Sequence, residues 1–105
     1  MSNLAIYQQI RNTVDAYLPG ARILLFGSHA RGDYDSHSDY DLLIITSGNL
    51  TSKEKISWMS ILGRALVLSI NAPVDVLVNS EEEVREKQEL PGHVIRTAMR
   101  EGMFL

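Results

Sequence analysis

Two neighbouring stretches decide the fold: Leu24-Leu25-Phe26-Gly27-Ser28-His29-Ala30-Arg31-Gly32 and, after a polar loop, Ser38-Asp39-Tyr40-Asp41-Leu42-Leu43-Ile44-Ile45. Each contains an apolar run that predicts a buried strand. Alternate side chains of a strand share a face, so Asp39 and Asp41 point one way while Tyr40 and Leu42 point the other. Aspartate is rare inside strands, so a pair of aspartates at this position indicates a function other than strand formation. Two carboxylates on one face predict a magnesium site.

The first third of the chain predicts a helix, a strand and a short helix. Apolar residues at helical spacing predict a helix over residues 3–18, which Pro19-Gly20 ends. Residues 22–26 predict a buried strand. We expect Ser28 to cap a short helix whose free backbone N–H groups point back toward that strand and form an anion site. Gly32 should end this helix, and a polar loop over 33–38 leads to a second strand over 40–46.

The rest of the chain predicts three more helices and one more strand. Thr51 and Glu54 form a capping box that begins a helix ending near residue 70, and its apolar residues surround most of its circumference. Residues 74–78 predict a strand that carries Asp75. Ser80 should cap a short acidic helix, and residues 91–100 predict a last helix ended by Gly102. This order predicts a mixed α/β (α+β) fold with a small three-stranded sheet flanked by helices.

Length and composition narrow the class of protein. With 105 residues we expect a single domain over 1–105, and the 45% apolar and 22% charged fractions are typical of soluble globular proteins. No apolar run approaches the ~20 residues of a membrane span, and no segment has the pattern of a signal peptide. The absence of cysteine fits a cytoplasmic location. A net charge of -3 argues against an extended nucleic-acid surface.

One constellation of residues resembles a known family. The chain has Gly27-Ser28, then ten residues, then Asp39-x-Asp41, and farther on a strand-borne Asp75. It resembles the Gly-Ser-x10-Asp-x-Asp pattern of the minimal nucleotidyltransferase (MNT) family in the DNA polymerase beta superfamily. The resemblance covers nearly the whole chain, including its Arg-Glu-Gly-Met-Phe-Leu ending. It implies the nucleotidyltransferase fold and a single minimal nucleotidyltransferase domain.

The resemblance also implies catalytic and metal-binding roles. ATP would be the substrate, and two magnesium ions would neutralise charge on the attacking, bridging and leaving oxygens. Asp39 and Asp41 would bridge both ions. Asp75 would bind the catalytic ion and accept the proton of the attacking hydroxyl. Attack on the alpha phosphorus would release pyrophosphate.

The phosphate-binding roles fall on the Gly-Ser turn and the short helix after it. Ser28 and the N–H groups that follow would hold the terminal phosphates, with Gly27 letting the backbone come close. Arg31 would add positive charge there. The loop that follows departs from the resembled family, whose members often carry basic or small residues where this chain has Asp33 and Asp35. Such an acidic loop predicts weaker nucleotide binding or a different acceptor.

A domain this small has little surface to enclose a base or an acceptor, so we expect a partner to complete the pocket. In the resembled family the partner is often an all-helical ribonuclease toxin of the HEPN class. There the nucleotidyltransferase acts as the antitoxin and moves AMP from ATP onto a toxin tyrosine. The resemblance thus implies a magnesium-dependent protein adenylyltransferase that docks through the helix over 52–70 or through the C-terminal helix. A homo-oligomer remains an alternative.

Other interpretations stay open from the sequence. The chain could neutralise its partner by contact alone, with a relic site, or transfer a nucleotide to a small hydroxyl compound such as an aminoglycoside. Alternating acidic residues also resemble a calcium loop, but Ser38 stands where an EF-hand needs Gly and Ile44 where it needs Glu. We therefore exclude calcium. The scattered histidines favour solvated or capping roles over metal ligation. Arg64, Arg96 and Arg100 are expected to be solvated or, less favoured, to line the nucleotide pocket.

Overall fold

The computed structural model describes residues 2–105, which hold five helices and four strands. The elements follow one another as α1 (Asn3–Tyr17), β1 (Arg22–Phe26), α2 (Gly27–Arg31), β2 (Tyr40–Thr46), α3 (Ser52–Ile70), β3 (Val74–Ser80), α4 (Glu81–Lys87), α5 (Val94–Glu101) and β4 (Met103–Phe104). Of the helices in this part of the chain, none is both long and apolar enough to cross a membrane.

The strands form one mixed sheet in the order β3-β2-β1-β4. Strand β1 pairs antiparallel with both β2 and β4, while β2 and β3 are parallel. The end of β1 therefore lies beside the beginnings of β2 and β3. The register makes this explicit: Phe26 pairs with Asp41, and Asp41 pairs with Asp75.

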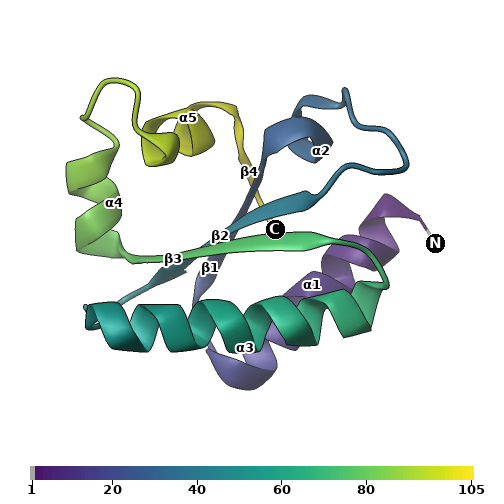
Figure 1. Cartoon of the computed structure of the whole chain (residues 1–105), viewed down its shortest axis with the longest axis horizontal. Helices are drawn as coiled ribbons and strands as arrows, with labels where there is room; N and C mark the ends of the chain where they lie inside the picture. Colours follow the sequence, from purple (N-terminus) through teal and green to yellow (C-terminus); the bar gives the residue numbers. More distant parts are fainter. Residues whose placement is uncertain (1) are drawn as a thin grey trace.

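Helices cover both faces of the sheet. Figure 1 shows α1 and α3 on one side, with α2, α4 and α5 on the other. Because strand side chains alternate, Leu25 and Leu42 join the core under α1 and α3, whereas Leu24 and Leu43 join a second core that includes Ile95 of α5. The odd-numbered side chains of β2 share the α5 face. Asp41 is therefore on the α5 face, next to the end of β1.

Most predicted elements are confirmed, and the predicted caps at Thr51 and Ser80 are confirmed in detail. Thr51 caps α3 and Ser80 caps α4, each in a complete capping box. Gly32 ends α2 in the left-handed conformation, with φ of 86°. Strands β1 and β2 have the predicted bounds, and β3 continues to Ser80. Local hydrogen-bonding patterns thus determine most of the boundaries in this chain.

Three predictions about the elements were wrong. Ser28 does not cap α2, because the chain turns one residue earlier: Phe26 takes the cap position, and Gly27 begins the helix. The last helix begins at Val94 and not near residue 91, because Gly92 has φ of +77° and His93 caps the helix through its ring. The sheet has a fourth strand, β4, which is only two residues long.

The C-terminal segment is packed closely on β1. A Cβ atom on Gly102 would lie 2.6 Å from the carbonyl oxygen of Ala98 and 2.7 Å from Cγ of Leu24. Only glycine fits at this approach. Strand β4 then pairs with β1, and the Leu105 N–H donates to the Ile23 carbonyl at 2.9 Å. These contacts place the end of α5, with Glu101, beside α2.

Candidate active site

The turn between β1 and α2 is built against the carboxylate of Asp41. Gly27 has φ of +73°, a conformation that favours glycine. A Cβ atom on Gly27 would lie 2.0 Å from Oδ2 of Asp41 and 2.9 Å from its Cγ. The sequence predicts that Gly27 lets the backbone approach a phosphate. The structure adds a second reason for glycine, which is the close approach of the Asp41 side chain.

Two of the three predicted aspartates are neighbours across paired strands. Asp41 and Asp75 face each other in the parallel register of β2 and β3, so their side chains lie on the same face of the sheet. Asp39 lies just before β2, two positions from Asp41. Asp39 and Asp75 are exposed, whereas Asp41 is half-buried. The three acids lie at the end of the sheet where α2 begins, and this group of Asp39, Asp41 and Asp75 is called the acidic edge.

The charges of these acids act on one another. Burial raises the pKa of Asp41, and the negative charges of Asp75 and Asp39 raise it further. His29 and Arg31 act to lower it. Like charges that raise a carboxyl pKa cost energy at neutral pH. The site therefore holds a concentration of negative charge that a cation would relieve.

The donor chemistry of this edge fits magnesium, which prefers carboxylate oxygens. Within residues 2–105, however, no three His, Cys, Asp or Glu side chains are grouped closely enough to hold a metal ion. The three aspartates are thus adjacent along one edge without being closed around a single point. Mg²⁺ usually keeps several waters and shares its ligands with substrate phosphates, so an all-protein cage is not its usual site.

The predicted phosphate-binding residues lie directly beside Asp41. Ser28 is inside the first turn of α2, where backbone N–H groups have no partner within the helix. The Gly27 N–H has a partner elsewhere in the chain: it donates to Oε1 of Glu101 at 3.1 Å. The anion position nearest the strand is thus taken by a carboxylate from α5.

Arg31 is paired with two acidic side chains. Its Nε donates to Oδ2 of Asp33, and its Nη1 donates to Oε1 of Glu101, each at 3.1 Å. These hydrogen bonds, that of Asp33 first, raise the pKa of Arg31. Sequence reasoning missed Glu101, although the Arg-Glu-Gly-Met-Phe-Leu ending that carries it was part of the resemblance. Its partner Gly27 is 74 residues away along the chain, so no local pattern connects the two.

His29 is held between two aromatic rings next to the acids. Its ring stacks on Tyr40 with centroids 3.7 Å apart and on Tyr34 with centroids 4.3 Å apart. Its Nε2 also lies 3.3 Å from the Ser38 carbonyl. The stack fastens the polar loop over 33–38 to α2 and β2. This is a packing role and not the solvated or capping role predicted for the histidines, whereas His93 does cap α5.

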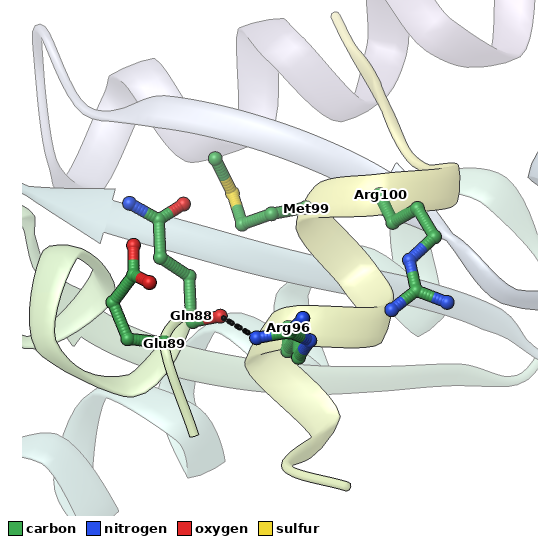
Figure 2. Close-up of a pocket in the computed structure, with 5 residues that line it drawn as sticks. All are labelled: Gln88, Glu89, Arg96, Met99 and Arg100. Atoms are coloured by element: carbon green, nitrogen blue, oxygen red, sulfur yellow. Dashed lines mark hydrogen bonds between the residues drawn. The ribbon is translucent and has the colours of Figure 1, made fainter. Parts of the chain in front are cut away.

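A pocket of about 380 Å³ lies beside α5. Figure 2 shows Arg96 and Arg100 projecting from α5 across from Gln88 and Glu89, with Nη1 of Arg96 donating to the Gln88 carbonyl at 3.4 Å. Its remaining lining residue is Met99, which packs on the core under α5. None of the predicted catalytic or phosphate-binding residues lines this pocket.

Comparison with known families assigns the chain. A family model described as nucleotidyltransferase domain matches residues 7–102. The chain belongs to the nucleotidyltransferase domain family. The family resemblance and the fold predicted from the motif are confirmed, with one strand more than expected.

Two archaeal relatives in this family come from Methanocaldococcus jannaschii. The provisionally named protein adenylyltransferase MJ0604 is 36% identical over 84 residues, which are 80% of this chain and 76% of that protein. The likewise provisionally named MJ0141 is 51% identical over 43 residues, which are 41% of this chain and 43% of that protein. The match thus covers less than half the length of MJ0141.

Several solved structures share the fold. One is a toxin-antitoxin crystallised with AMP-PNP, with a TM-score of 0.66, 18% identity, and coverage of 93% of this chain and 70% of that one. Another is the MNT antitoxin in complex with the tri-AMPylated HEPN toxin of Shewanella oneidensis, with a TM-score of 0.62 and 15% identity. The match includes 98% of this chain and 71% of that one. At these identities the likeness shows a common fold.

Proposed function

We propose that this nucleotidyltransferase transfers AMP from ATP to a tyrosine hydroxyl of a HEPN-class toxin and thereby acts as its antitoxin. The single observation that carries the proposal is the position of Asp41, against the Gly27 turn and in register with Asp75. Two carboxylates beside a strand-to-helix turn can hold divalent ions and a triphosphate in contact with one another. The MNT antitoxin that shares the fold was crystallised with an AMPylated toxin.

Each predicted residue has a role in this reaction. Asp39 and Asp41 would hold two Mg²⁺ ions, with Asp75 as a further ligand of the catalytic one. The ions would supply charge neutralisation on the phosphate oxygens. Ser28 and Arg31 would hold the terminal phosphates. The tyrosine oxygen attacks the alpha phosphorus, its proton passes to Asp75, and the bond to the leaving pyrophosphate breaks, so that one ATP gives one AMP-tyrosine and one pyrophosphate.

The exposed apolar surface of α3 supports a docking role for this helix. Ile56 and Leu68 are 63% and 78% exposed. A hollow of about 290 Å³ next to Leu68 is lined by Tyr17, Ser60, Ile61, Arg64, Ala65 and Leu68. The C-terminal end of α3 is joined through residues 71–73 to the edge strand β3, which carries Asp75 near its start. A helical partner on α3 would therefore reach the acids, which lie on the opposite face of the sheet, by extending round β3.

The direct test is transfer of labelled AMP to the partner. ATP labelled at the alpha phosphate, MgCl₂ and the cognate HEPN-class protein should yield a labelled partner, and its labelled tyrosine can be located by mass spectrometry. Asp41→Asn should abolish transfer, while Asp15→Asn on the opposite side of the fold should leave it intact. Label on the partner with wild-type protein but equal label with Asp41→Asn would refute the proposed site.

A contact-only antitoxin is distinguished by the same variant in cells. If the chain neutralises its partner by binding, Asp41→Asn should still protect cells that express the toxin. If it is an enzyme, that variant should lose protection although it still binds the partner in a pull-down. Release of pyrophosphate with a small hydroxyl acceptor and no protein partner would instead indicate a small-molecule substrate.

A further inference from the structure

Arg31 is the cation predicted to add positive charge at the phosphates, and in the structure it is paired with two acids. Asp33 and Glu101 each accept one of its N–H bonds at 3.1 Å. The resemblance to the MNT family gives no role to either acid. Because two carboxylates more than balance one guanidinium, a triphosphate that binds Arg31 has to replace a partner or meet excess negative charge.

The two acidic partners of Arg31 are held differently. The Glu101 side chain is 21% exposed and also accepts the Gly27 N–H, so it is tied to two groups. It stands at the end of α5, directly before the tightly packed Gly102. The Asp33 side chain is 62% exposed and lies in the polar loop after Gly32, where Arg31 is its ion-pair partner. Asp33 is therefore the partner that can leave.

We propose that Asp33 competes with the triphosphate for the guanidinium of Arg31 and so lowers the affinity of the site for nucleotide. This inference rests on the proposed function. A triphosphate carries more negative charge than one carboxylate, and its oxygens can accept two hydrogen bonds from the planar guanidinium. On nucleotide binding the Arg31 Nε–H bond passes from Asp33 to a phosphate oxygen, the Asp33 side chain turns to solvent, and the bond to Glu101 is kept.

Removing the competitor should tighten triphosphate binding. We expect Asp33→Asn to bind magnesium tripolyphosphate and magnesium ATP about three- to fivefold more tightly than the wild type, the effect expected from an exposed ion pair. Isothermal titration calorimetry measures both ligands. Tripolyphosphate has no base, so a gain with both ligands assigns the effect to the phosphates. Thermal unfolding verifies that the variant is folded.

A matched control and a double variant isolate the contact with Arg31. Asp15→Asn removes a carboxylate that also pairs with an arginine, at 3.4 Å from Arg11 on α1, and should leave the affinity unchanged. In an Arg31→Ala background, Asp33→Asn should give no gain, because the residue competed for is gone. A gain that persists without Arg31, or that Asp15→Asn reproduces, would mean only a general charge effect and would overturn the inference.

The outcomes separate this inference from the proposed function. Tighter binding by Asp33→Asn that requires Arg31 supports the inference even when no partner protein is labelled. Labelling of the partner with no change in triphosphate affinity refutes the inference and leaves the function standing. If the wild type binds neither tripolyphosphate nor ATP in magnesium, both are refuted.

Discussion

Replacing Gly27 with alanine tests whether Asp41 is packed against the turn as the structure shows. The new Cβ atom would overlap Oδ2 of Asp41, at 2.0 Å, on a backbone with φ of +73°. The left-handed conformation costs an alanine about 1–2 kcal/mol. Overlap with a packed side chain costs about 1–3 kcal/mol more, unless the carboxylate rotates away from the turn. We therefore expect Gly27→Ala to lose about 2–5 kcal/mol of unfolding free energy.

Gly32→Ala is the matched control. Gly32 has a similar φ of +86°, but a Cβ there meets nothing within 4 Å, so it should lose only about 1–2 kcal/mol. Urea unfolding of both variants gives the difference, and Asp41→Ala should recover the steric part in the Gly27→Ala background. If Gly27→Ala and Gly32→Ala lose equal free energy and Asp41→Ala rescues neither, the close contact between Gly27 and Asp41 is wrong.

Three further predictions concern charge and the partner. Burial and the charges of Asp75 and Asp39 raise the pKa of Asp41, so its ionised form opposes folding at neutral pH. In EDTA, Asp41→Asn should therefore have a higher melting temperature than the wild type. This difference in melting temperature should shrink as the pH falls through the raised pKa of Asp41. Partial burial acts to raise the pKa of Glu83. The hydrogen bonds that Glu83 accepts from Lys55 and from the Ser80 backbone, with the charges of Lys55 and Lys87, outweigh burial and lower this pKa from 4.5 to about 2. Ionised Glu83 should thus add up to about 3 kcal/mol to the free energy of unfolding above pH 4.5, and this contribution should be lost as the pH falls toward 2. Urea unfolding of Glu83→Gln should therefore show a large loss of unfolding free energy at pH 7 and little loss at pH 2.5. A loss that does not depend on pH would contradict this prediction. Leu68→Asp, at a side chain 78% exposed, should weaken partner binding at least about tenfold with no change in melting temperature, whereas Glu86→Lys on α4 should not weaken it; calorimetric titration with the partner measures both.

The sequence predicted those parts of the fold that depend on neighbours in the chain. The capping boxes at Thr51 and Ser80 mark where α3 and α4 begin, and the apolar run over 22–26 has the bounds of β1. The start of α2 was predicted one residue late, at a turn where Gly27 is packed against Asp41 of β2, a contact that no local sequence pattern reveals. Two-residue β4 has no periodicity of its own and exists because it pairs with β1.

The candidate site was likewise predictable only in part. Strand alternation predicts that Asp39 and Asp41 share a face, and the register of β2 with β3 brings Asp41 and Asp75 together. The contacts of Glu101 with Gly27 and Arg31 join residues 74 and 70 positions apart in the sequence, so they depend on how α5 packs beside α2. Their effect on the phosphate position is visible only in the folded chain.

Counting divalent ions tests the central claim most directly. Mn²⁺ gives an electron paramagnetic resonance signal that distinguishes free from bound ion, and a nucleotide analogue that cannot be cleaved between its alpha and beta phosphates keeps the site loaded. With the analogue bound, we predict two Mn²⁺ ions per wild-type chain. For Asp41→Asn we predict no more Mn²⁺ than the nucleotide analogue carries on its own. Two ions retained by Asp41→Asn, or no ion in the wild type beyond that carried by the free nucleotide, would contradict the assignment of the aspartates beside the Gly27 turn.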